Sequence, residues 1–204
     1  MRNRIPARGK EVFLFVVLSD QKHRAGSAFA ETTIVHNQQW AKKQLATLRH
    51  AYAKAPYVAE VFEQVKTLLS AAHRTIGALS QAFIERTAQH IGIGSPFVRS
   101  SKLQDIKGRR DHRLLAICAQ LSAGTYLTAS KSAAYIESDC AFEGSGVALR
   151  YHYYDYPTYV QHGDGFITYI SVDLLMNVSY ESALDVIRSG RREPLTSAQM
   201  KDAA

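Results

Sequence analysis

The sequence predicts a single mixed α/β domain with a small sheet and a large helical share. Its 204 residues, 46% of them hydrophobic and 21% charged, are ordinary for a globular protein and enough to bury a core. Between residues 38 and 91 apolar side chains recur at helical spacing, whereas residues 12–19 and 147–156 have the composition or alternation of strands. We expect this domain to span residues 1–190 and to be followed by a polar, frayed C-terminal tail, residues 191–204.

The first strand is expected at Val12–Ser19, because VFLFVVLS is short, rich in β-branched and aromatic residues, and apolar on both faces. Such a segment is typical of the centre of a sheet. A second strand is expected within Ser27–Val35. The apolar run Val12–Leu18 has seven residues and follows Glu11, whereas a membrane span needs about 20 apolar residues. We therefore expect a cytoplasmic protein with no transmembrane segment.

Three helices are expected next. Asn37 can cap a helix that starts near Gln38 and is broken by Pro56. Its core-facing stripe is formed by Trp40, Ala41, Leu45, Leu48 and Tyr52. Two further helices are expected at about Val58–Ala72 and Thr75–Ile91, each with its own apolar stripe.

The second half of the chain is expected to alternate short strands with short helices. The expected elements are an extended arm at Ile93–Arg99, a helix at Arg113–Leu121 capped by Asp111, a strand end at Tyr126–Leu127, a small helix around Ser132–Ile136, a strand at Val147–Tyr156, and helical turns at Asp173–Asn177 and Tyr180–Ser189. Gly190 is expected to end the last helix.

The chain is basic, with a formal net charge of +7. Such a surface attracts nucleic acid, acidic membranes or small phosphorylated ligands. No DNA- or RNA-binding motif is visible, and aromatic residues do not alternate with basic ones as in a single-strand groove. We therefore expect a small phosphorylated substrate, such as a nucleotide sugar or an activated acyl donor, and no nucleic acid. Cofactor and oligomeric state stay open.

Well-known catalytic motifs are absent from the sequence. Cys118 and Cys140 form neither a disulfide framework nor a metal-ligand spacing, and we interpret Cys118 as a buried structural thiol. There is no P-loop, no Gly-x-Ser-x-Gly and no His-x-x-x-His pair, so no metal site is expected.

Two basic segments with hydroxyl residues are candidate phosphate sites. Ser100 and Ser101 precede a run of Lys and Arg that ends at Arg113, next to a helix start. Ser130 and Lys131 lie in an expected strand-to-helix turn, where backbone N–H groups and an ammonium can hold phosphate. A solvated basic loop and an ordinary capped turn are the alternatives.

The segment Tyr151–Asn177 holds the third candidate constellation: Tyr156, Tyr159, Gln161, Asp173 and Asn177. On a helix, Asp173 and Asn177 lie four residues apart on one face, among apolar neighbours. Tyrosine hydroxyls and a Gln amide suit a sugar, and Asp173 is the best candidate for a general base. A carboxylate that caps a helix or bonds within the core is the alternative.

Five blocks of the chain resemble, in order, the pattern of the WbqC-like protein family, found in bacterial surface-polysaccharide (O-antigen) gene clusters. The blocks are Asn3–Ile5, Trp40–Glu60, Gly92–Leu103, Arg113–Ile136 and Val147–Asn177. The chain departs from this pattern where an N-terminal strand and a Met-Gln-Pro-like turn are expected, so we expect it to lack that portion. Glycines expected near Ala129 and Ser179 are also replaced.

The resemblance implies a role in polysaccharide biosynthesis, with transfer of an aminoacyl group, such as glycyl, to an activated sugar. On this interpretation Asp173 deprotonates the acceptor, Ser101 and Arg113 hold phosphate, and Tyr159, Gln161 and Asn177 position the sugar. The alternative is a non-catalytic or vestigial protein of the same pathway that binds a sugar nucleotide.

Overall fold

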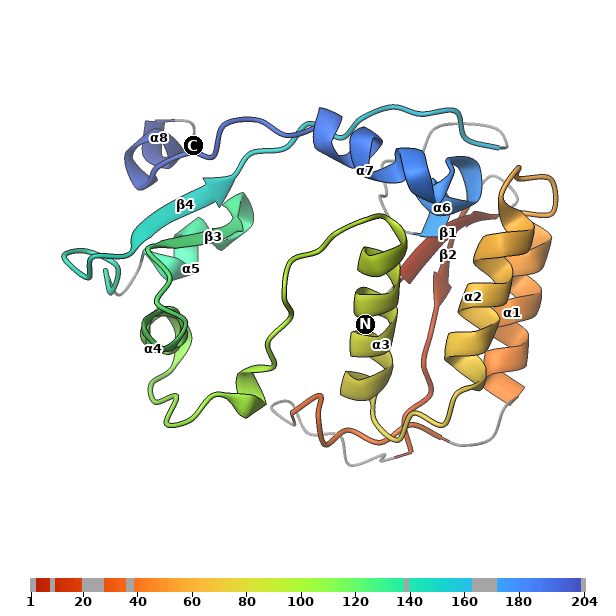
Figure 1. The fold of residues 1–204 in the computed structure, drawn as a ribbon, viewed down its shortest axis with the longest axis horizontal. Helices are drawn as coiled ribbons and strands as arrows, with labels where there is room; N and C mark the ends of the chain where they lie inside the picture. The colour runs from red at the N-terminus through yellow and green to blue at the C-terminus, as the bar shows by residue number, and fades with distance from the viewer. Residues whose placement is uncertain are drawn as a thin grey trace. The chain divides into compact units, whose positions relative to one another are not determined.

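The computed structural model describes residues 3–7, 10–19, 28–35, 39–137, 140–162 and 172–202 (Figure 1). Within these ranges helices predominate and the strands form two small sheets, which confirms the mixed α/β fold class. The chain divides into two compact units. Unit 1 comprises Met1–Ser95 and Tyr156–Ser189, and unit 2 comprises Pro96–Asp155 and Gly190–Ala204.

Unit 1 begins with an antiparallel hairpin of β1 (Asn3–Ala7) and β2 (Lys10–Leu14), in which Ile5 pairs with Val12. The prediction of a central strand buried on both faces at Val12–Ser19 was wrong. In this two-stranded sheet one face packs on the core through Ile5, whereas Phe13 on the other face is 37% exposed. Phe15, just beyond β2, is 57% exposed. The apolar composition of this segment therefore predicted burial on both faces, whereas the strand is covered on one face.

The chain after β2 runs beside the segment before α1. Isolated bridges join Leu18 to Ile34 and Thr33 to Thr75, in place of the second strand expected within Ser27–Val35. Ile34 N also donates to Arg74 O at 3.1 Å. These contacts fix residues 33–35 against the start of α3.

Three long helices follow, as the periodicity predicted: α1 (Gln39–Ala51), α2 (Val58–Ser70) and α3 (Ile76–His90). Leu48 and Tyr52, from the predicted stripe of the first helix, are 2% and 0% exposed. The expected cap Asn37 lies outside the described residues. Thr75 caps α3, since its Oγ1 accepts from Ala78 N at 3.2 Å.

Two C-terminal helices complete unit 1, α6 (Val172–Asn177) and α7 (Tyr180–Ser189), both at the predicted positions. Leu174, Leu175 and Met176 pack in one apolar cluster with Ile5, Leu48 and Tyr52. Tyr57 N donates to Met176 O at 3.1 Å, which ties α6 to the start of α2. Segments more than 100 residues apart in the sequence thus share one core.

Unit 2 is built on a parallel pair, β3 (Thr125–Ala129) and β4 (Ala148–His152), with Thr128 paired to Tyr151. The shorter helical elements around it are η1 (Ser100–Lys102), α4 (Arg110–Gln120), η2 (Ser130–Ser132), α5 (Ala133–Ile136) and α8 (Ser197–Asp202). Its core contains Ile136, Phe142, Leu149 and Tyr151.

Two expectations for unit 2 need correction. The fourth helix begins at Arg110, so Asp111 lies in its first turn and Arg109 is at the N-cap position. The C-terminal segment is not frayed over its described part, because Leu195 N and Tyr151 N exchange hydrogen bonds with each other's carbonyls at 2.9 and 2.8 Å. Tyr151 is 0% exposed, so this pairing helps to cover the core.

Candidate functional site

The candidate site in unit 1 is centred on Asp173 in the first turn of α6. This turn packs against the core through the apolar residues Leu174, Leu175 and Met176. Asp173, which precedes them, is therefore buried as well, with 1% of its surface exposed. A carboxylate at such a depth needs hydrogen-bond partners, because the loss of its hydration is costly. The partners come from two other segments.

Two tyrosine hydroxyls supply the partners of Asp173. Tyr52, the last core residue of the first helical stripe, donates its hydroxyl to Oδ1 at 2.7 Å. Tyr159 donates its hydroxyl to Oδ2, also at 2.7 Å. Both carboxylate oxygens are therefore engaged, and hydrogen bonds to a charged acceptor of this length are among the stronger ones in proteins.

The two tyrosines differ in their access to solvent. Tyr52 is 0% exposed, whereas Tyr159 is only half-buried. Burial, together with the Asp173 charge and hydrogen bond, raises the pKa of Tyr52 far above its ordinary value. Burial and the hydrogen bond to Asp173 likewise raise the pKa of Tyr159. Both side chains are consequently protonated donors at neutral pH, and of these two tyrosines Tyr159 is the one with solvent exposure.

Asn177 and Gln161 lie in the same network. The Asn177 amide donates from Nδ2 to Asp173 O at 2.8 Å, and its Oδ1 accepts from His162 N at 2.7 Å. Asn177 thus ties the segment after Tyr159 to α6 through backbone groups. A hydrogen bond with the Gln161 side chain lowers the pKa of the Tyr159 hydroxyl, and so opposes the larger rise caused by burial and Asp173. The structure therefore brings together Tyr159, Gln161, Asp173 and Asn177.

Tyr52 was missed as a site residue, although the sequence placed it on the buried stripe of a helix. A buried tyrosine hydroxyl needs a partner, and Asp173 is the polar residue of another apolar segment. Tyr156, named with this constellation, has 59% of its surface exposed.

The predicted phosphate residues Ser101 and Arg113 belong to unit 2. Ser101 is exposed within η1, and Arg113 is exposed on α4. The Arg113 guanidinium donates from Nη1 to Ile106 O at 3.0 Å, and so holds the basic loop against the helix. Whether these two residues share a site with Asp173 stays a prediction, since Asp173 belongs to unit 1.

Ser130 and Lys131 form the start of η2, directly after β3, and both side chains are exposed. The turn is a single 3-10 turn with no side-chain cap hydrogen bond. Ala129, where the family pattern has a glycine, has a φ of −72° and so adopts a conformation open to any residue. The substitution of that glycine therefore causes no backbone strain.

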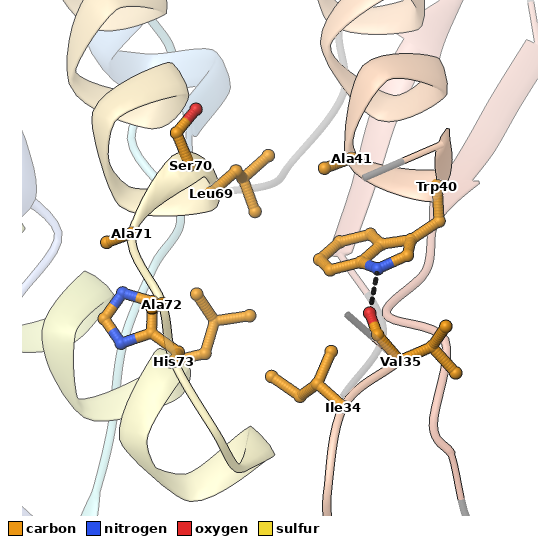
Figure 2. A pocket seen from close by; sticks show the side chains of 10 residues that line it. Ile34, Val35, Trp40, Ala41, Leu69, Ser70, Ala71, Ala72 and His73 are labelled. Carbon is orange, nitrogen blue, oxygen red and sulfur yellow. Dashed lines mark hydrogen bonds between the residues drawn. The ribbon is translucent and has the colours of Figure 1, made fainter. Parts of the chain in front are cut away.

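A pocket in unit 1 lies apart from this network, and the sequence did not indicate it (Figure 2). The residues that line it are Ile34, Val35, Trp40, Ala41, Leu69, Ser70, Ala71, Ala72, His73 and Leu79. The bridge between Thr33 and Thr75, together with the packing of Ile34 and Leu79 against Trp40 and Leu69, brings these separate segments together, so no local pattern predicts the pocket.

The described ranges hold no group of three or more His, Cys, Asp or Glu side chains that could bind a metal ion. Nor does any helix within them combine the length and the apolar character needed to cross a membrane.

Comparison with known proteins gives one match. A model of the family described as "WbqC-like protein family" matches residues 1–184, which is most of the chain. No curated protein and no solved structure matches this chain. The match includes the whole Tyr52, Tyr159, Asp173 and Asn177 network.

Proposed function

This chain belongs to the WbqC-like protein family, and we propose that it acts in bacterial surface-polysaccharide (O-antigen) biosynthesis by transferring an aminoacyl group, such as glycyl, to an activated sugar. Family membership supports the pathway, since the family is associated with surface-polysaccharide gene clusters. One observation supports the chemistry: the hydroxyl of the half-buried Tyr159 is bonded at 2.7 Å to the buried Asp173 carboxylate.

The proposed acceptor contacts Tyr159, because Asp173 itself is 1% exposed and has both oxygens occupied by hydroxyl donors. As the sugar amine or hydroxyl attacks, its proton passes to Tyr159 Oη while the Tyr159 proton passes to Asp173 Oδ2. Tyr159 acts as a phenol and not as a phenolate, consistent with its raised pKa. Asp173 is thus the proton acceptor, reached through Tyr159.

Bond changes at the donor complete the step. The acceptor atom forms a new bond to the donor's acyl carbon, and the bond from that carbon to its activating group breaks with the electron pair. The leaving group then takes the proton back from Asp173 along the same path. No external oxidant or reductant is needed.

The other residues position the reactants. Asn177 fixes the segment that carries Tyr159 through its hydrogen bond from His162 N. Gln161, which acts on the Tyr159 hydroxyl, is the amide placed to contact the sugar. Ser101, Arg113, Ser130 and Lys131, all exposed in unit 2, are proposed to hold the phosphate of the small-molecule substrate. The protein is proposed to be cytoplasmic, where activated donors are available.

A second candidate function is a non-catalytic, sugar-nucleotide-binding protein of the same pathway. It is favoured by the completeness of the Asp173 network, in which each carboxylate oxygen already has a donor. Such a network is stable without any substrate and can serve the fold alone.

The experiment is the repeat-unit structure of the surface polysaccharide, determined by NMR, for a parent strain and a strain with this gene deleted. Loss of one aminoacyl substituent with an intact sugar backbone supports the transferase, and an unchanged polysaccharide overturns it. The deletion strain is then complemented with wild type, Tyr159→Phe, or the matched control Tyr57→Phe. We expect wild type and the control to restore the substituent, and Tyr159→Phe to fail while the protein accumulates normally. Restoration by Tyr159→Phe points instead to the non-catalytic function.

A further inference from the structure

The solvent-facing side of α1 gathers basic residues. The helix packs on α2 and β1 at the edge of unit 1 (Figure 1). Ala41 and Leu48 lie on its buried side, and the side chains opposite them are exposed, as helical spacing requires. We define the basic face as the exposed basic residues of α1 and of the turn that follows it: Lys42, Lys43, Arg49, His50 and Lys54.

No acidic residue balances this face within its own segment. Residues 32–59 contain no Asp or Glu, so their four Lys and Arg side chains give a net charge of +4 with His neutral. The Arg49 guanidinium lies over the Phe62 ring, 5.0 Å from its centroid, and so is held without an acidic partner. Within the described parts of the chain, no ion pair includes a residue of the basic face.

The neighbouring elements do not neutralise the face either. On α2, Glu63 pairs with Lys66 at 2.9 Å, and the charge of Glu60 acts on Tyr180, whose pKa it raises. β1 contributes the basic residue Arg4 and no acidic one. The positive charge of the basic face is therefore open to an anionic partner outside the chain.

Two of the charges stand where they oppose the helix itself. Lys42 lies in the first turn of α1, Lys43 follows it, and the first turn contains no acidic residue. The N-terminal end of a helix carries a partial positive charge, so lysines there destabilise it. The stability of α1 does not account for these two lysines, whereas an external anion offsets their cost.

The basic face suits an extended, flat array of anions. Lys42 and Arg49 are seven residues apart, which is about 10 Å along the helix axis, and Lys54 extends the face further. Its other exposed residues are Ala46 and Ala53. The face thus offers no amide or aromatic side chain to contact a nucleic-acid base, and its small residues let the cations approach a plane of phosphates closely.

From these observations we propose that the basic face of α1 docks this protein on an anionic phospholipid surface. Clusters of Lys and Arg on an amphipathic helix are attracted to acidic bilayers. The contact is electrostatic, because the face exposes no large apolar side chain to enter the bilayer, so salt should reverse it. The proposal goes beyond the proposed aminoacyl transfer, since none of the residues assigned to that reaction lies on this face.

Co-sedimentation of the full-length protein with vesicles tests the docking. One set of vesicles is phosphatidylcholine alone, and the other is phosphatidylcholine and phosphatidylglycerol in equal parts. We expect binding to the second set only, with release at about 1 M NaCl, where the screening length is about 3 Å. No binding to the acidic vesicles overturns the proposal. Tighter binding to duplex DNA than to acidic vesicles, at the same low salt, overturns the choice of lipid as the partner.

A triple variant tests whether α1 is the surface that binds. Lys42→Gln/Lys43→Gln/Lys54→Gln removes three charges, each of which contributes roughly fivefold near an acidic bilayer, so we expect binding to weaken roughly a hundredfold. The matched control, Arg74→Gln/Arg188→Gln/Arg191→Gln, removes the same charge at exposed residues of other elements. Equal weakening in the two triple variants shows an effect of net charge alone and overturns the assignment to α1.

Thermal unfolding of the same variant provides a second readout. Glutamine keeps the helix propensity of lysine, and the substitution removes two charges that oppose the dipole of α1. We therefore expect the Tm of the lysine triple variant to equal or exceed that of wild type. A lower Tm contradicts the argument that these lysines do not serve the stability of the helix.

Discussion

The hydroxyl of Tyr52 can be removed with little change in shape by the substitution Tyr52→Phe. In the native protein this hydroxyl donates to Asp173 Oδ1 at 2.7 Å, and the two residues are 0% and 1% exposed. The phenylalanine ring keeps the packing against the apolar cluster of unit 1. The substitution therefore isolates one hydrogen bond to a buried carboxylate.

The expected cost follows from that burial. Hydrogen bonds to charged groups contribute about 1.5–3 kcal/mol, and the carboxylate oxygen left behind at this depth finds no water to replace the donor. We expect the free energy of unfolding to fall by about 2 kcal/mol, which for a chain of this size lowers Tm by roughly 4–8 °C. Tyr159→Phe should cost less, about 1 kcal/mol, because water reaches the half-buried Tyr159.

The assay is equilibrium unfolding in urea, followed by fluorescence of Trp40, which belongs to unit 1 as Tyr52 does. Tyr57→Phe is the matched control, since Tyr57 is half-buried near the same core and no partner of its hydroxyl is found within the described ranges. We expect that control to stay within about 0.5 kcal/mol of wild type. If Tyr52→Phe costs no more than Tyr57→Phe, the hydrogen bond to Asp173 does not contribute as argued.

Three further predictions concern stability. Burial raises the pKa of Tyr180 to about 12, so its contribution to the free energy of unfolding is complete below pH 10 and is lost as the pH rises from 10 towards 12. Absorbance at 295 nm should show this tyrosine ionising together with unfolding. Tyr52, Tyr151 and Tyr159, whose pKa values are also raised, should ionise in the same way. Gly108→Ala should lower the free energy of unfolding by about 1–2 kcal/mol, because Gly108 has a φ of +91° and a new Cβ would lie 3.1 Å from the His112 Cβ. Gly124→Ala is the control, since the space around Gly124 is open. Equal Tm values for the two variants would contradict the argument. Thr75→Ala should cost about 1 kcal/mol through the lost cap of α3 at Ala78 N, whereas Thr75→Ser should largely preserve Tm.

Local pattern predicted the helices well. The stripe of Trp40, Leu48 and Tyr52 indicated α1, which starts one residue after the predicted Gln38 and ends at Ala51, ahead of the predicted break at Pro56. Tyr180–Ser189 was predicted with its observed bounds. Helical spacing is a property of residues close together in the sequence, so it can be recognised without knowing how the rest of the chain folds. The same spacing placed Asp173 and Asn177 on one face of α6.

Strand environment was predicted less well. The segment after Val12 is apolar enough for a central strand, yet Phe13 is exposed on a two-stranded hairpin and Phe15 is exposed just beyond it. Whether both faces of a strand are covered depends on which other segments pack on it, and composition does not contain that information. Likewise, the polar residues from 191 onward gave no sign that Leu195 would pair with Tyr151.

The sequence by itself determined the helical elements, the family and a short list of polar residues within apolar segments. Only the tertiary structure decided that Tyr52 and Asp173, 121 residues apart, would share a hydrogen bond, and that Trp40 and His73 would line one pocket. The physical reason is that helix periodicity arises from contacts three or four residues apart, whereas a buried carboxylate or a pocket is completed by side chains from distant segments that meet only when the core forms.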